Sequence, residues 1–67
     1  MSTTTLRITG MTCGHCVAAV TAALKAVPGV ELVQVNLERG EGVVQGSASA
    51  DQLVGAVEAE GYAARVA

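Results

Sequence analysis

The sequence predicts one small α+β domain in which four strands and two helices follow the order β-α-β-β-α-β. Three observations support this prediction. Four short segments alternate apolar and polar residues, two longer segments repeat apolar residues at helical spacing, and turns rich in Gly or Pro separate them. Because the chain has only 67 residues and no low-complexity linker, we expect a single domain over residues 1–67.

The first half of the chain predicts a strand, a helix and a second strand. Residues 6–9 (LRIT) alternate, with Leu6 and Ile8 on one side of the first strand. The helix that follows repeats apolar residues at helical spacing: Val17, Val20, Leu24 and Val27. The pair Pro28-Gly29 is expected to end it. Residues 30–37 form the second predicted strand, with Leu37 on its apolar face.

The second half predicts two further strands around a second helix. Residues 43–46 (VVQG) are expected to form the third strand and residues 62–66 the fourth. Ser49 as N-cap with Gln52 three residues later fits a capping box, and Gly61 suits the position after the helix. Each strand has one apolar face, so both helices are expected on one side of the sheet. With right-handed crossovers, this order gives the ferredoxin-like βαββαβ arrangement, a four-stranded antiparallel sheet with two helices on one face.

Composition limits what so small a domain can do. Hydrophobic residues make up 51% of the chain, with no Trp and no Phe, so the core is expected to be aliphatic. A chain this short buries only about 60% of the surface that its unfolded form exposes, so a deep catalytic cleft is not expected. The size of the chain therefore argues against a large catalytic cleft.

Charge and hydropathy exclude further classes of function. The four basic residues are scattered along the sequence among six acidic ones, and no aromatic platform accompanies them, which argues against nucleic-acid binding. No apolar run approaches the roughly 18 residues of a membrane span, so direct membrane insertion is not expected. No signal peptide is visible, and together with the Met start this predicts a cytoplasmic protein with reduced thiols.

The only two cysteines lie three positions apart in residues 10–16 (GMTCGHC), where the first strand leads into the first helix. A helix N-terminus lowers the pKa of a nearby thiol, and thiolates bind soft metal ions. A disulfide across so short a loop would remove little entropy from the unfolded chain. A thioredoxin-like centre also uses Cys-x-x-Cys, but an aromatic residue usually flanks that motif, whereas Met11 and Thr12 precede this one. The pattern favours a metal site and leaves redox chemistry open.

The longer stretch at residues 10–16 resembles the Gly-Met-x-Cys-x-x-Cys signature of the heavy-metal-associated domain family, in its bacterial copper-chaperone type. That family comprises small copper chaperones, a periplasmic mercury-binding protein and N-terminal modules of metal-transporting P-type ATPases. Residues 60–62 (EGY) also resemble the loop before the last strand in bacterial members. The resemblance covers nearly the whole chain and implies that Cys13 and Cys16 are the metal ligands.

Two thiolates without an obvious third ligand favour copper(I), because this soft ion accepts two sulfur ligands whereas zinc prefers four ligands. Family members selective for zinc, cadmium or lead often carry an acidic residue just before the first cysteine, and Thr12 stands there in this chain. Mercury(II) also accepts two thiolates and stays open as an alternative. The missing signal peptide argues against that alternative.

Four residues are expected to support the loop without ligating the ion. Met11 corresponds to a family residue that packs under the loop, and Thr12 leaves the loop without a hard oxygen ligand. His15 lies between the cysteines and is expected to point outward, toward solvent or toward a second copy. Tyr62 either packs as a strand residue or shields a thiolate and donates a hydrogen bond to it, and both interpretations stay open.

The resemblance implies a soluble, cytoplasmic copper(I) chaperone that is not an enzyme. It would pass Cu(I) by ligand exchange to a copper-transporting P-type ATPase, through the metal-binding domain of that ATPase. A copper-bridged homodimer is a further expected assembly. The alternatives are an N-terminal metal-binding domain of a heavy-metal P-type ATPase, a mercury(II)-binding protein and, less favoured, a dithiol oxidoreductase.

Overall fold

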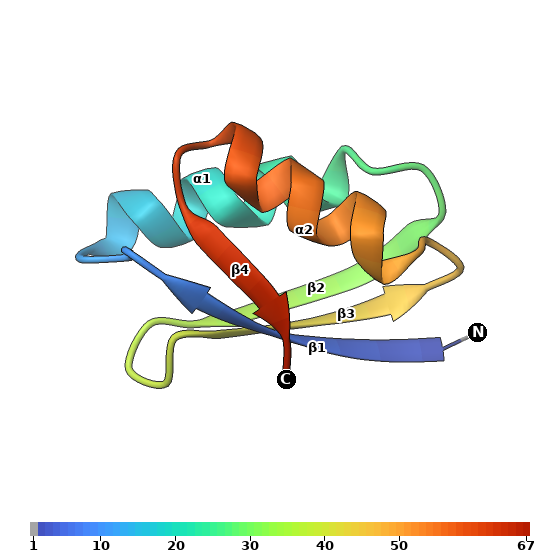
Figure 1. The fold of residues 1–67 in the computed structure, drawn as a ribbon, viewed down its shortest axis with the longest axis horizontal. Helices are drawn as coiled ribbons and strands as arrows, with labels where there is room; N and C mark the ends of the chain where they lie inside the picture. Colours follow the sequence, from blue (N-terminus) through green and yellow to red (C-terminus); the bar gives the residue numbers. More distant parts are fainter. Residues whose placement is uncertain (1) are drawn as a thin grey trace.

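The computed structural model of the protein describes residues 2–67, so Met1 lies outside the described part of the chain. Its elements are β1 (Ser2–Thr9), α1 (Gly14–Lys25), β2 (Val30–Asn36), β3 (Glu41–Gly46), α2 (Ala50–Ala59) and β4 (Ala63–Val66). The strands form one antiparallel sheet in the order β2-β3-β1-β4, and both helices lie on one face of it (Figure 1). The predicted ferredoxin-like fold is therefore confirmed.

A single layer of aliphatic side chains between the sheet and the helices forms the core. Its buried members come from every element except β4: Leu6, Ile8, Val20, Leu24, Val33, Val44, Leu53 and Val57. No buried polar or charged residue occurs within residues 2–67. Burial of apolar surface, worth about 25 cal/mol per Å², is therefore the main force that holds the two layers together.

Several element boundaries differ from those that hydrophobic alternation predicts. β1 begins at Ser2 instead of Leu6, β3 at Glu41 instead of Val43 and β4 at Ala63 instead of Tyr62, while α1 ends at Lys25, before Val27. The early part of β1 consists of Ser and Thr, which do not alternate in hydropathy, but it pairs along its length with β3. Threonine suits a pleated strand, so pairing with β3 extends β1 over residues whose hydropathy does not alternate.

The prediction that Leu37 belongs to the buried face of the second strand is wrong. β2 ends at Asn36, and Leu37 lies in the following turn with 39% of its surface exposed. The Arg39 backbone N–H donates to Asn36 Oδ1 at 3.0 Å, and the Gly40 N–H donates to the Leu37 carbonyl at 3.3 Å. These bonds close a turn directly after Asn36. The turn also requires a positive φ of 63° at Gly40, a conformation that favours glycine. The turn therefore removes Leu37 from the alternation of the strand.

The C-terminal end of α2 determines where Tyr62 lies. Gly61 adopts a φ of +94°, as predicted for the residue after the helix. Its N–H donates to the Glu58 carbonyl at 2.9 Å, and the Tyr62 N–H donates to the Val57 carbonyl at 3.4 Å. These two bonds make a Schellman motif, which satisfies the last helical carbonyls and turns the chain directly into β4. The turn between α2 and β4 lies at the end of the domain where α1 begins (Figure 1), and it places Tyr62 beside Gly10.

The N-terminal end of α2 carries the predicted capping box. Ser49 Oγ accepts a hydrogen bond from the Gln52 N–H at 3.2 Å, and Gln52 Oε1 accepts one from the Ser49 N–H at 3.2 Å. Asp51 in the first turn adds a negative charge at the positive end of the helix. The two helices have 12 and 10 residues, and within residues 2–67 neither is long and apolar enough to cross a membrane.

Replacing Ser49 by Ala should destabilise the domain by about 1 kcal/mol, because the first turn of α2 loses the side-chain acceptor that satisfies the Gln52 N–H. Urea unfolding followed by circular dichroism measures this. Ser47→Ala is the matched control, since the described residues give Ser47 no side-chain hydrogen bond. Equal midpoints for wild type and Ser49→Ala would contradict a stabilising role for the capping box.

Candidate metal centre

The loop between β1 and α1, together with the first turn of α1, carries the two cysteines at the left-hand end of the domain in Figure 1. After β1 ends at Thr9, Gly10 adopts a φ of +101°, which lets the chain turn away from the sheet. Met11 is partly buried and packs against the core, so it anchors the loop. Cys13 is exposed, Cys16 is half-buried, and both thiols are free. The loop therefore presents a dithiol at the surface.

Cys13 and Cys16 occupy the N-cap and N3 positions of α1. Cys13 is extended, and its carbonyl accepts from the N–H groups of Cys16 at 3.1 Å and Val17 at 3.3 Å. The Cys13 side chain makes no capping hydrogen bond within the described residues, and the first turn holds no acidic residue. The unpaired amides and the dipole of this helix end favour a negative group. A cysteine thiolate is the anion that this turn can supply.

Hydrogen bonding lowers the pKa of Cys16 from its ordinary value of 9.0 to about 6. The backbone of Thr12 contributes most, followed by the Tyr62 hydroxyl and then the Thr12 hydroxyl, whose Oγ1 lies 3.7 Å from Cys16 Sγ. Each donor stabilises the thiolate relative to the thiol. The same hydrogen bond raises the pKa of Tyr62, because its hydroxyl must stay protonated to donate to Cys16. At neutral pH Cys16 is therefore mainly a thiolate.

Tyr62 packs against the core, and its ring lies over Gly10, where an added Cβ would come within 3.4 Å of Tyr62 Cδ1. Its hydroxyl is also one of the groups that lower the pKa of Cys16. Two contacts were not predicted from the sequence: the Tyr62 ring over Gly10, and the Thr12 hydroxyl beside Cys16 Sγ. Gly10 at the end of the first strand is visible in the sequence, but its contact with Tyr62 is not, because Tyr62 lies near the other end of the chain.

The donor set at this end of the domain is small. Within residues 2–67, no group of three or more His, Cys, Asp or Glu side chains is placed to hold a metal ion. His15 lies between the cysteines and is exposed. Two sulfur atoms suit a soft ion of low coordination number better than zinc, which prefers four ligands. The roles of these residues toward a metal stay predictions.

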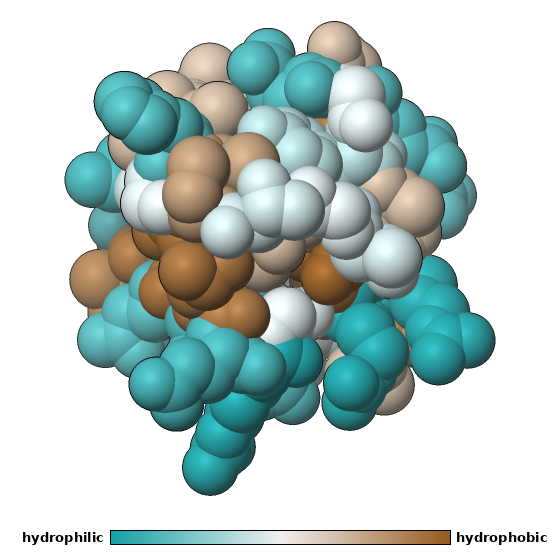
Figure 2. Space-filling view, turned by 90° about the vertical axis from the view of Figure 1, so that its left-hand side faces the viewer, coloured by the Kyte–Doolittle hydropathy of each residue, from teal (hydrophilic) through white to brown (hydrophobic). Residues whose placement is uncertain are grey.

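The surface around the loop combines apolar and polar residues. Figure 2 views this end of the domain and shows a brown, hydrophobic patch beside paler surface in the middle, with teal, hydrophilic residues around the edges. Leu37 contributes at this end, because the turn that contains it is tied to β1 by a 2.6 Å hydrogen bond from the Ile8 N–H to the Gly40 carbonyl. Exposed apolar surface beside a reactive pair of thiols suits contact with another molecule.

Fold and site together define a small ferredoxin-like domain with an exposed dithiol at the start of its first helix. The family model of the heavy-metal-associated domain matches residues 5–63. The chain therefore belongs to the heavy-metal-associated domain family, as the signature at residues 10–16 predicts.

Relatives of known name or structure match nearly the full length of the chain. The copper chaperone CopZ of Staphylococcus aureus (strain bovine RF122 / ET3-1) is 42% identical over 65 residues, which cover 92% of this chain and 96% of CopZ. The N-terminal domain of PacS from Synechocystis PCC6803 is 37% identical with a TM-score of 0.96, covering 100% of this chain and 98% of that domain. A copper-binding domain from HMA7, a P-type ATPase, is 28% identical with a TM-score of 0.97, covering 100% and 95%.

The lowered pKa of Cys16 gives a direct pH prediction. In a Cys13→Ser background, the alkylation rate of Cys16 by iodoacetamide should reach half its maximum near pH 6 in the folded protein, and near pH 9 in urea. Because the pKa is lower in the folded state, the stabilisation from this thiolate is complete above pH 9 and is lost as the pH falls through 6.

Tyr62→Phe should raise the pKa of Cys16 toward its ordinary value, because one hydrogen-bond donor to the thiolate is removed. Thr12→Val should act in the same direction, and Thr9→Val, a matched change outside the contact, should have no effect. An unchanged alkylation profile in Tyr62→Phe would leave Tyr62 with a packing role alone.

Proposed function

We propose that this domain is a cytoplasmic copper(I) chaperone that holds its cargo between Cys13 and Cys16. The observation that carries the proposal is the pairing of an exposed Cys13 with a Cys16 whose pKa is lowered to about 6. One of the two ligands therefore needs no deprotonation at neutral pH. The similarity to CopZ and to the copper-binding domain from HMA7 supports copper as the metal. The two-sulfur donor set supports the +1 state, which is soft.

Transfer would proceed by ligand exchange at the exposed end of the domain. A thiolate of the partner bonds to the two-coordinate ion and forms a three-coordinate bridge. One of the two original sulfur–copper bonds then breaks, and the released cysteine remains a thiolate or takes a proton from solvent. Copper keeps its +1 charge throughout, and no bond of an organic substrate changes. We therefore propose a carrier and not an enzyme.

The partner that we propose is the metal-binding domain of a copper-transporting P-type ATPase. Support comes from the structural likeness to a copper-binding domain of such an ATPase, since similar domains can present similar dithiols to each other. The apolar patch in the surface around the loop provides a contact area for this encounter (Figure 2). The exposed His15 would then face the partner, or a second copy in a copper-bridged homodimer.

A second candidate function is favoured by the match to the N-terminal domain of PacS. In that case the domain would receive copper as part of a heavy-metal P-type ATPase, using the same two cysteines. The two functions differ in the direction of transfer. Loading this domain with Cu(I), mixing it with a separate ATPase domain and measuring the final distribution of copper distinguishes a donor from an acceptor.

Cys13→Ser and Cys16→Ser should each lower the affinity for Cu(I) by at least about tenfold, because the described residues offer no third thiolate as a substitute. Competition with a Cu(I) chelator in a reducing buffer measures this. The thermal unfolding midpoint of the metal-free protein should change little, since neither cysteine belongs to the core. His15→Ala is the matched control in the same loop. Unchanged Cu(I) affinity in either serine variant would exclude the two-thiolate site.

Thr12→Asp should shift metal preference toward zinc, because a carboxylate beside Cys13 adds a hard oxygen ligand that divalent ions favour. The ratio of zinc to Cu(I) affinity should rise by about tenfold, measured by the same competition with both metals. Thr12→Asn has nearly the same shape without the charge and serves as the control. A ratio that stays constant in Thr12→Asp would refute the selectivity argument.

A further inference from the structure

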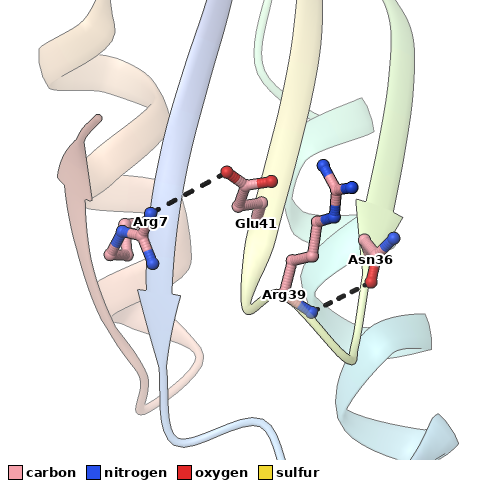
Figure 3. Close-up of polar contacts among 4 residues, drawn as sticks. All are labelled: Arg7, Asn36, Arg39 and Glu41. Atoms are coloured by element: carbon pink, nitrogen blue, oxygen red, sulfur yellow. Dashed lines mark hydrogen bonds and ion pairs between the residues drawn. The ribbon is translucent and has the colours of Figure 1, made fainter.

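The open face of the sheet carries a row of charged side chains that crosses three strands. Arg7 in β1 has Glu41 of β3 as its register partner on one side and Arg65 of β4 on the other. Glu41 is in turn opposite Asn36 of β2. Arg39 stands beside this row, because its backbone N–H is bonded to Asn36 (Figure 3). We call Arg7, Arg39 and Arg65, together with Glu41, the arginine row.

The arginine row concentrates positive charge in an acidic protein. The chain has a formal net charge of −2, yet three of its four basic residues belong to the row. Only Lys25 and five acidic residues lie outside it. The basic residues are scattered along the sequence, but strand pairing makes Arg7 and Arg65 direct neighbours in the sheet.

Nothing in the fold accounts for this arrangement. Arg7 and Arg65 are direct partners on neighbouring strands, and like charges in that position destabilise a sheet. The one compensating contact within residues 2–67 joins Arg7 Nη2 to Glu41 Oε2 at 3.9 Å, with 49% of the Arg7 side chain exposed. An ion pair this long and exposed contributes little to stability. Two of the three guanidinium groups therefore have no carboxylate partner among the described residues.

A hollow of about 250 Å³ adjoins the row on the β2–β3 side. Its lining combines hydrogen-bonding groups with valine side chains: Gln34, Val35, Asn36, Arg39, Glu41 and Val43. The side chains of Arg39 and Asn36 rise over the sheet at this place (Figure 3). From Asn36 in β2 to Arg65 in β4, the hollow and the row together span three strand spacings, or about 14 Å. That width exceeds one phosphate or carboxylate group and suits several carboxylates along an extended chain.

We propose that the arginine row is a docking surface for an acidic segment of a partner protein. Its carboxylates pair with the guanidinium groups, which bind them through two parallel hydrogen bonds, and its backbone lies along the hollow. Arg7 lies two residues before the end of β1, so the docked segment sits about 7 Å from the start of the cysteine loop. Docking of this kind is separate from metal transport and requires no bound metal.

The test uses the metal-free, reduced protein and a blocked hexaglutamate peptide as the probe. At about 20 mM salt, ¹⁵N NMR titration should shift the backbone amides of Arg7, Glu41 and Arg65 and the side-chain Nε of Arg39. Arg65→Glu should weaken binding by about tenfold, and Arg65→Gln by a smaller factor. Lys25→Glu makes the same change in net charge in the last turn of α1 and should leave binding unchanged within about twofold. Raising the salt to about 300 mM should abolish most of the binding.

Three results would overturn the proposal. The first is a loss of binding in Lys25→Glu as large as that in Arg65→Glu, which would reduce the effect to net charge. The second is an equal pattern of shifts with inorganic phosphate at the same concentration, which would make the row a site for small anions. The third is self-association of wild type that Arg65→Glu abolishes, which would assign the row to a second copy. Thermal unfolding of all variants checks that each is folded.

Discussion

One face of a four-stranded sheet has to be covered by two short helices, and the fully buried side chains between them are all aliphatic. Eight buried residues lie between the sheet and the helices, and each helix supplies two of them. Because the layer is thin and contains no buried polar group among the described residues, reactive side chains have no place inside it. The chemistry of the domain therefore lies at the ends of elements and on the uncovered face of the sheet.

The dithiol illustrates how the edge of this layer controls reactivity. Cys16 is half-buried, and burial alone would raise the pKa of a thiol. Hydrogen bonds from Thr12 and Tyr62 outweigh that effect and bring the pKa to about 6. Thr12 is a neighbour in sequence, whereas Tyr62 arrives from the far end of the chain through the turn that ends α2. The position of α2 on the sheet therefore influences the pKa of Cys16 in α1, because the turn after α2 places Tyr62.

Local patterns predicted the features that depend on local chemistry. The capping box at Ser49, the glycine at Gly61 and the alternation of Leu6 and Ile8 could all be inferred, because each depends on residues within four positions. Leu37 was misplaced because turn bonds that involve Asn36 and Gly40 ended the strand early.

The signature at residues 10–16 located the candidate site, but not the interactions that tune it. The ring of Tyr62 over Gly10 joins residues 52 positions apart, which no window of sequence contains. Arg7 and Arg65 are likewise close only because β1 and β4 are neighbours in the sheet. Contacts of this kind depend on strand order and register, so they become visible only once the fold is known.

The two helices begin with the same pair of positions, N-cap and N3, used in opposite ways. In α2 these positions hold Ser49 and Gln52, which satisfy each other's backbone and close the first turn. In α1 they hold Cys13 and Cys16, and the Cys13 side chain makes no capping hydrogen bond within the described residues. An ion held by both sulfurs would link the same two positions that the capping box links in α2. Such an ion would bridge the first turn of α1 through its side chains, so loading would restrain that turn and unloading would release it.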